Sequence, residues 1–190
     1  MPSIDDVFNN LTLRKTLLAF RLPIALALLA GLLLTIDPHW FWPGLVVSLL
    51  GMVLQLWVFG CIRTREVLAV NGPYMFVRNP MYIARFLLIL GLVLMTGIPW
   101  LLLVYALVYY FYMVNRVERE EPVLHEAFGG EYLAYCKHVP RFLPRLKPYR
   151  EGRFWFFDME NFRRQHGLVN LAAFAALYLL CYLAAFHINA

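Results

Sequence analysis

Charged residues and cysteines are scarce in this sequence. Of its 190 residues, 15% are Asp, Glu, Lys or Arg and 62% are hydrophobic, and the mean hydropathy is +0.62. Soluble domains of this size are usually nearer half apolar, so the composition argues against one. The cysteines form no C-x-x-C pair, and we interpret them as packing residues rather than as a disulfide framework. They are Cys61, Cys136 and Cys181.

The motifs of common soluble enzymes are also missing. The chain has no P-loop, no G-x-G-x-x-G and no G-x-S-x-G, so ATPase, dinucleotide-binding and serine hydrolase functions have no support. His125 and His138 lack metal-ligand spacing, and no H-E-x-x-H occurs. We therefore expect no metal site.

Long apolar runs are what the sequence has instead. An uncharged apolar run of about 18 residues or more is typical of a transmembrane helix. We predict one all-α, polytopic membrane domain, 1–190, with about five transmembrane helices. The first run is longer than a signal-peptide core and no small-residue cleavage pattern follows it, so we expect a retained helix. The five predicted helices cover 17–36, 43–62, 82–96, 99–116 and 167–188.

The basic residues indicate which helix ends face the cytosol. The net charge is +5, and the connections 36–42 and 96–99 contain no Lys or Arg. Cytosolic connections carry the Lys and Arg excess, so we predict a cytosolic N-terminus and a C-terminus outside. This explains the basic charge better than nucleic-acid binding does. The pattern suits a prokaryotic inner membrane, and the endoplasmic reticulum is compatible with it too.

A Gly-, Pro- and Arg-rich segment, 72–82, leads into the helix at 82–96. It is either a loop that re-enters the membrane, with Arg78 reaching the headgroups, or part of a site. Arg85 lies a few residues into the helix, where a centrally placed charge costs about 2.5–3.5 kcal/mol. A functional role and a snorkelling side chain explain Arg85 equally well.

A second polar segment, 116–135, begins at the end of the helix at 99–116. We expect Pro122 to kink this helix or to open a new one. Gly129 and Gly130 are placed to end it.

Two glutamates of this segment lie near the apolar boundary. Glu120 and Glu121 could hold the hydroxyls or the ammonium group of a polar ligand. Tyr132 and Tyr135 follow three residues apart, a spacing that places both on one helix face. The segment therefore combines acidic and aromatic side chains beside the membrane.

Prolines hold the next stretch extended, because they forbid a regular helix. They are Pro140, Pro144 and Pro148. We expect Arg141 and Phe142 to lie across the membrane surface, where a basic strap on anionic headgroups is the simplest interpretation. Further along, the aromatic run 154–157 is predicted to form an interfacial helix lying on the membrane.

Taken in order, these segments resemble one family. The pattern reads G-x-Y-x-x-x-R-[HN]-P-x-Y, a helical hairpin, E-E-x-x-L-x-x-x-F-G-x-x-Y-x-x-Y, and V-P-R-F-x-P. It is similar to the isoprenylcysteine carboxyl methyltransferase and phospholipid N-methyltransferase superfamily of integral membrane enzymes, and it covers about 71–145. The residues that carry it are Gly72, Tyr74, Arg78, Asn79, Pro80, Tyr82, Glu120, Glu121, Leu124, Phe128, Gly129, Tyr132, Tyr135, Val139, Pro140, Arg141 and Pro144.

The chain departs from this family in three places. Asn79 stands where the family usually has His, and an amide cannot exchange a proton near neutral pH. Pro122 directly follows the paired glutamates. The stretch 150–190 adds the interfacial segment and a further transmembrane helix.

The resemblance implies methyl transfer from S-adenosylmethionine to a membrane lipid or a lipidated small substrate. It implies Arg141 and Glu121 as catalytic residues, and Arg85, Arg141 and Phe142 as substrate-binding residues. An amine acceptor must lose a proton, for which Glu121 or His138 is the nearest candidate, whereas a carboxylate acceptor needs no base. The implied cofactor-binding residues are Tyr74, Arg78, Asn79, Pro80, Tyr82, Glu120, Glu121 and Tyr135.

Two other interpretations stay open. Membrane sterol reductases, which use NADPH, look similar around residues 135–140, where this chain reads Y-C-K-H-V-P. A membrane scaffold without catalysis would explain the helices but not the Gly, Arg, Glu and Tyr residues beside the headgroup plane. The small size of the chain and its paired glutamates favour methyl transfer over reduction.

Overall fold

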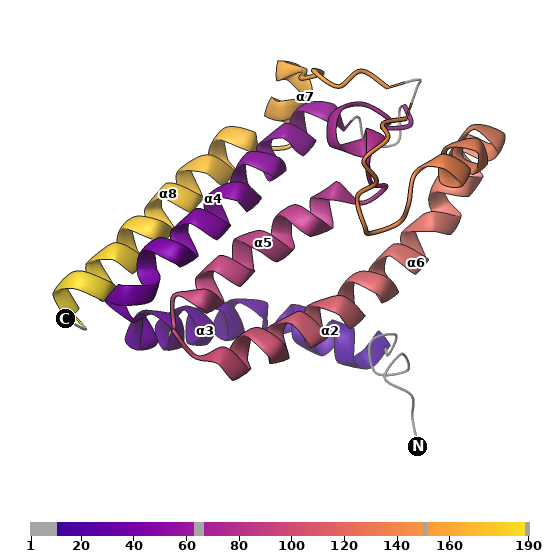
Figure 1. Cartoon of the computed structure of the whole chain (residues 1–190). Helices are drawn as coiled ribbons and strands as arrows, with labels where there is room; N and C mark the ends of the chain where they lie inside the picture. The colour runs from indigo at the N-terminus through magenta and orange to yellow at the C-terminus, as the bar shows by residue number, and fades with distance from the viewer. Residues whose placement is uncertain (1–10, 63–66, 150–151, 189–190) are drawn as a thin grey trace. The chain divides into compact units, whose positions relative to one another are not determined.

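The structure is a computed structural model that describes residues 11–62, 67–149 and 152–188 (Figure 1). Residues 63–66 of the connection between the second and third predicted helices lie outside the described residues. The first two residues of the predicted segment 150–190, and its last two, lie outside them as well.

The described parts of the chain are helical and contain no strand. This confirms the all-α prediction. The elements in order are α2 (Leu11–Ala19), α3 (Arg21–Thr35), α4 (Pro38–Cys61), the 3-10 helix η1 (Gly72–Met75), α5 (Pro80–Leu94), α6 (Pro99–His138), α7 (Met159–Arg164), α8 (Gly167–Leu183) and the π-helical turn η2 (Ala184–Ile188).

Three of the described helical stretches are long and apolar enough to cross a membrane, so the chain is a polytopic membrane protein. They are Pro38–Cys61, Pro99–His138 and Gly167–Ile188. Two shorter apolar helices, α3 and α5, have 15 residues each. A full crossing takes about 20 residues, so the predicted number of five spans depends on how α3 and α5 lie in the bilayer and stays a prediction.

The first predicted helix, 17–36, is interrupted in the structure. Helix α2 begins earlier and ends at Ala19, and α3 begins at Arg21. Pro23 has no backbone N–H, so the carbonyl of Ala19, four residues before it, loses its helical donor. The backbone changes direction at Phe20, whose φ and ψ are −94° and 13°.

The described residues form two compact units, to which α4, α5, α6 and α8 each contribute a part. The first unit contains the chain up to Ser48, Ile89–Glu118 and the chain from Ala176. In it, the ring of Phe41 on α4 packs edge-on against Tyr182 and Phe186, at 5.8 and 5.5 Å between centroids.

The second unit contains Leu49–Leu88 and Arg119–Ala175. Gly51 of α4 lies against the backbone of α5, since a Cβ there would approach Leu88 N to 2.6 Å and Ala84 O to 2.8 Å. A core of buried side chains joins the connection after α4 to the end of α6 and the residues beyond it. Its members are Leu68, Met75, Tyr132, Tyr135, Val139 and Tyr149.

Helix α6 continues well past the predicted end at residue 116. It runs through Pro122 without ending and bends at Gly129, where φ is 52° and ψ is −125°. Residues with a side chain rarely adopt a positive φ, so glycine permits this bend. Gly129 therefore breaks the helix as predicted, but the chain resumes helical geometry and continues to His138.

The predicted interfacial helix at 154–157 is wrong. These residues are irregular, and the nearest helix is the short α7, which begins after Asp158. The Asp158 side chain accepts hydrogen bonds from Glu160 N and Asn161 N, so it fixes the helix start beyond the aromatic run. The aromatic rings pack on α4 instead, because the Trp57 ring stacks on Trp155 at 6.1 Å and its Nε1 donates to Phe156 O.

Candidate active site

All the predicted site residues lie in the second unit. Backbone hydrogen bonds align the first motif with the stretch after α6. Arg78 N donates to Pro140 O at 2.9 Å, and Arg145 N donates to Phe76 O at 3.0 Å. The two motifs, distant in sequence, are thereby held side by side without any side-chain contribution.

Glu121 is the centre of an ion-pair cluster. It accepts two hydrogen bonds from Arg141, one from Nε to Oε1 at 3.0 Å and one from Nη2 to Oε2 at 2.5 Å. Arg78 Nη1 lies 3.0 Å from Glu121 Oε1. The side chains are 15% exposed for Arg78, 18% for Glu121 and 36% for Arg141, so water screens the cluster only partly. Paired N–H donors make such arginine–carboxylate contacts strong and directional.

Arg78 occupies the most buried corner of this cluster. Burial by itself lowers its pKa, but the neighbouring Cys136 and Glu121 outweigh burial and raise the pKa above its ordinary value. Arg78 therefore stays protonated at every physiological pH. Its Nη1 also donates to Cys136 Sγ at 2.9 Å, whereas its buried Nε has no hydrogen-bond partner among the described residues.

The side chain of Asn79 supports the cluster by contacting the backbone of Arg141. Its Nδ2 donates to Arg141 O at 3.1 Å. The amide therefore positions the chain at Arg141, a task that needs a donor and no exchangeable charge. This is one physical account of how Asn can stand where the family usually has His.

Tyr82 and Glu120 form a second polar pair. Tyr82 OH donates to Glu120 Oε2 at 2.9 Å, and the tyrosine is buried. Arg85 is exposed one turn further along α5, with its guanidinium carbon 6.0 Å from the centre of the Tyr82 ring. Tyr82 thus contacts both the carboxylate of Glu120 and the guanidinium of Arg85.

Tyr74 and Tyr135 are packing residues in this structure. Tyr135 OH donates to the backbone carbonyl of Tyr74 at 2.7 Å, and both side chains are buried. Burial raises the pKa of Tyr74 far above its ordinary range, so its hydroxyl stays neutral. Contact of these rings with a cationic ligand remains a prediction.

The remaining predicted residues lie at the edges of the site. Pro80 is buried at the first position of α5. Phe142 is half-buried, and the Arg141 guanidinium carbon lies 6.0 Å from its ring centre. His138 is exposed, and its Nδ1 contacts Ala134 O on its own helix at 2.8 Å.

Cys136 is the site residue that the sequence did not single out as functional. All three cysteines are free, and Cys61 and Cys181 are buried as expected for packing residues. Cys136, by contrast, contacts Arg78. The available signal was its position four residues after Tyr132, on the same face of α6.

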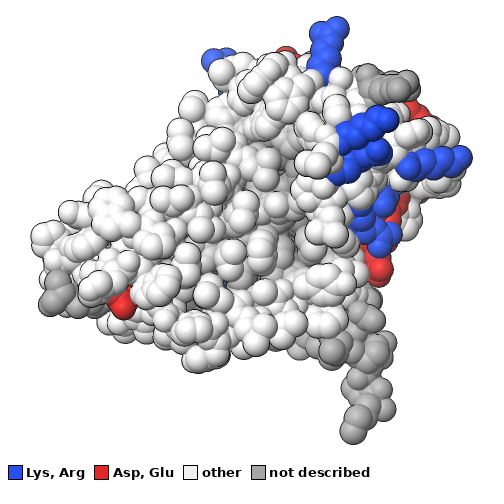
Figure 2. All heavy atoms as spheres, viewed as in Figure 1, with Lys and Arg blue, Asp and Glu red and all other residues white. Residues whose placement is uncertain are grey.

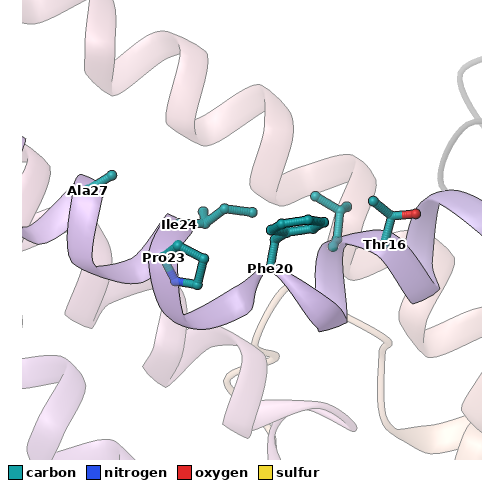
Figure 3. Close-up of a pocket in the computed structure, with 6 residues that line it drawn as sticks. Thr16, Phe20, Pro23, Ile24 and Ala27 are labelled. Carbon is teal, nitrogen blue, oxygen red and sulfur yellow. The ribbon is translucent and has the colours of Figure 1, made fainter.

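Two depressions in the described surface lie away from the residues of the ion pairs. The larger, about 460 Å³, lies at the α2–α3 junction, and Figure 3 shows its side chains, among them Phe20 and Ile24, on one side of that junction. A second, about 280 Å³, is lined by residues of α4, of the connection after it and of the α7 region. Neither includes Arg78, Glu121 or Arg141, so size alone is a poor guide to chemistry here. Among the described residues, no group of three or more His, Cys, Asp or Glu side chains could hold a metal ion.

Comparison with known proteins connects this geometry to a family. A family model described as phospholipid methyltransferase matches residues 40–131. The chain is 33% identical to the cobalt-zinc-cadmium resistance protein CzcN of Cupriavidus metallidurans over 135 residues, which cover 67% of this chain and 62% of that protein. No solved structure matches the chain.

Two similar proteins are named as methyltransferases. The chain is 37% identical to the protein-S-isoprenylcysteine O-methyltransferase of Rattus norvegicus over 87 residues, 46% of this chain and 31% of that enzyme. It is 30% identical to the Homo sapiens enzyme of the same name over 164 residues, 73% of this chain and 57% of that enzyme. The chain thus spans less than two thirds of the length of these relatives. The resemblance seen in the motifs is confirmed: the family model and the similar enzymes support the superfamily that includes the isoprenylcysteine and phospholipid methyltransferases.

Proposed function

We propose that this protein transfers a methyl group from S-adenosylmethionine to an amphiphilic acceptor in the membrane, a lipid or an isoprenylcysteine-like molecule. The observation that carries the proposal is the Arg78–Glu121–Arg141 cluster, which joins one residue from each of the three motifs close to the start of the apolar helix α5. A polar cofactor and an apolar acceptor can each reach this position from its own phase. The similarity to the phospholipid methyltransferase family model and to isoprenylcysteine methyltransferases supports the same reaction.

The residues present fit the proposed cofactor. Buried Arg78 Nε has no partner among the described residues, and a guanidinium edge matches the carboxylate of the cofactor's methionine moiety. Glu120, held by Tyr82, offers acceptors to ribose hydroxyls or an ammonium group. When bound, S-adenosylmethionine supplies an electrophilic methyl group on a sulfonium.

The protein's part in such a transfer is mainly positioning and exclusion of water. Glu121 orients Arg78 and Arg141 relative to each other, and Asn79 fixes the backbone at Arg141. Arg141, the most exposed member of the cluster, is placed to orient an anionic group of the acceptor.

This geometry favours a carboxylate acceptor over an amine. A carboxylate needs no base, whereas an amine must first lose a proton. Glu121 is already paired with two arginines, and His138 contacts a carbonyl of its own helix. Neither of the two candidate bases is therefore poised to take a proton from the acceptor.

Cofactor binding is the experiment that tests the proposal. Purified protein in nanodiscs is titrated with S-adenosylhomocysteine and, separately, with NADPH. We expect saturable binding of the first alone, weakened at least tenfold in Arg78→Gln. The matched control is Arg163→Gln, an exposed arginine of α7, which should bind like the wild type.

The other outcomes discriminate the alternatives. Binding of NADPH alone would move the chain to the reductase class, and binding of neither would favour a scaffold. If S-adenosylhomocysteine binds, radiolabelled S-adenosylmethionine is offered with a prenylcysteine analogue and with phosphatidylethanolamine. Methylation of phosphatidylethanolamine alone would overturn the preference for a carboxylate acceptor.

The proposed location is a prokaryotic inner membrane, with the site on the cytosolic side. It rests on the positions of the basic residues, because cytosolic connections are rich in Lys and Arg.

A further inference from the structure

The stretch from Val139 to Tyr149, called the strap below, is fixed to the site but contains no helix. Its backbone hydrogen bonds reach the residues just before α5: Arg78 N to Pro140 O, Arg145 N to Phe76 O, and Tyr149 N to Met75 O. Arg145 Nη1 also donates to His138 O at the end of α6. The strap therefore has a defined position, and its prolines keep it from coiling into a helix.

Two leucines of the strap have no apolar surroundings within the described structure. Leu143 is 82% exposed and Leu146 is 100% exposed. Exposed leucines are ordinary on helices that face lipid, but the strap is not part of an apolar helix. Fixed backbone on both sides prevents these side chains from turning into the core.

The strap is hydrogen-bonded to the residues that lead into an apolar helix. Its partners, residues 75–78, directly precede α5, whose sequence is almost entirely apolar. On the neighbouring stretch Phe154 packs edge-on against Phe76 at 5.8 Å, and Trp155 is 86% exposed. Exposed tryptophans are typical of the boundary between water and hydrocarbon.

The charge of the strap complements an anionic surface. It contains three basic residues, Arg141, Arg145 and Lys147, and no acidic one. Figure 2 shows Lys and Arg side chains gathered over the C-terminal part of α6 and the segments that follow it. A combination of exposed leucines and basic side chains is typical of segments that bind membranes in their plane.

We propose that the strap is a membrane-docking surface. Leu143 and Leu146 insert between the headgroups of the adjacent leaflet, and Lys147 with Arg145 contacts anionic phosphates. This contact holds Arg141 at headgroup depth, where the polar end of an embedded acceptor lies. The inference concerns membrane contact and stands whether or not the chain transfers methyl groups.

A fluorescent probe at Leu146 tests the docking directly. Leu146→Cys and the control Leu133→Cys are labelled with an NBD maleimide and placed in phosphatidylcholine–phosphatidylglycerol nanodiscs. Leu133 is also exposed, but it shares its α6 face with the charged Lys137, four residues further on. The labelled wild type gives the background from the native cysteines, two of which are buried.

At position 146 we expect a blue-shifted emission, which should be quenched by lipids that carry a doxyl group on the acyl chain. At position 133 we expect the emission typical of a probe in water. Equal, water-like emission at both positions would overturn the proposal. So would a blue shift at 146 that persists in detergent without lipid and resists doxyl quenching, because another protein segment would then cover the leucine.

The dependence of probe insertion on lipid charge gives a second, independent test of the docking proposal. Insertion of the probe at 146 should increase when phosphatidylglycerol is added to phosphatidylcholine, and Lys147→Gln should reduce that increase by half or more. If phosphatidylglycerol increased the insertion of the probe equally in Lys147→Gln and in the chain with Lys147, the proposed contact of Lys147 with anionic lipid would be wrong. Because neither readout uses catalysis, failure here and failure of the methyltransferase proposal are distinguishable.

Discussion

At the scale of single residues, Glu121 decides the character of the site. A carboxylate between Arg78 and Arg141 balances positive charges that would otherwise repel each other, and its paired hydrogen bonds fix the guanidinium plane of Arg141. Because the cluster is largely shielded from water, removing the central anion would leave two cations facing each other. Glu121 is therefore better suited to orient the two arginines than to exchange a proton.

Glu121→Gln tests this role. Losing the charged hydrogen bonds should cost about 2–3 kcal/mol of transition-state stabilisation, roughly a 30- to 150-fold loss in kcat/KM for methyl transfer. Glu126→Gln, an exposed glutamate on the same helix, should leave kcat/KM unchanged. If the kcat/KM of Glu121→Gln equalled that of the wild type, the cluster would not serve the reaction.

Tyr135 gives the contrasting case of a site residue with a structural role. Its hydroxyl satisfies the buried carbonyl of Tyr74. Tyr135→Phe leaves that carbonyl unpaired and should lower the free energy of unfolding by about 1–3 kcal/mol. Thermal unfolding in a mild detergent measures this, and the affinity for S-adenosylhomocysteine should stay within threefold of wild type if the residue acts only through packing.

At the scale of elements, two glycines determine how helices bend and approach. Gly129 gives α6 its bend, which turns the final turns of the helix so that Tyr132, Tyr135 and Val139 enter the core around Met75. Gly51 allows α4 to contact the backbone of α5. The first requirement is conformational and the second is steric, so alanine should destabilise the protein at each position for a different reason.

Gly129→Ala should destabilise the protein although space is available for the methyl group. Nothing lies within 4 Å of a Cβ at Gly129 or at Gly130, but only Gly129 has a positive φ. We expect a loss of about 1–3 kcal/mol in Gly129→Ala from backbone strain. Gly130→Ala should be neutral or gain up to about 1 kcal/mol, because alanine favours helix. Equal melting temperatures for the two variants would contradict the bend.

Gly51→Ala should destabilise the protein for a steric reason. Its added methyl group would meet backbone atoms of α5 that cannot move independently, an overpacking cost of about 1–3 kcal/mol. Gly31→Ala on α3 is the control, because nothing lies within 4 Å of a Cβ there. Unfolding of Gly51→Ala at the wild-type temperature would show that α4 and α5 are further apart in the membrane.

At the scale of the whole molecule, the distribution of charge predicts the topology. The connections 36–42 and 96–99 lack Lys and Arg, whereas basic residues flank the site. Cysteines introduced at His39, whose side chain is 92% exposed, and at Lys147 should react with an impermeant maleimide from opposite sides of the membrane. Labelling of both from one side in oriented vesicles would contradict the predicted topology, with the unaltered chain as background.

The sequence by itself determined the class of protein and the neighbourhood of the site. Long apolar runs require helices, because unpaired backbone groups are too costly in lipid, and the ordered motifs pointed to the superfamily. Local geometry also followed: a glycine pair predicted the break in α6, and prolines predicted the extended strap.

Only the tertiary structure decided which side chains meet. Asn79 contacts the carbonyl of a residue 62 positions away, and Tyr135 contacts one 61 positions away, pairs that no local pattern specifies. The aromatic run 154–157 had the composition of an interfacial helix, yet packing on Trp57 and the cap at Asp158 kept it irregular. Helix and turn preferences act over a few residues, whereas the ion pairs of Glu121 depend on how separate segments pack, so the site's geometry had to come from the fold.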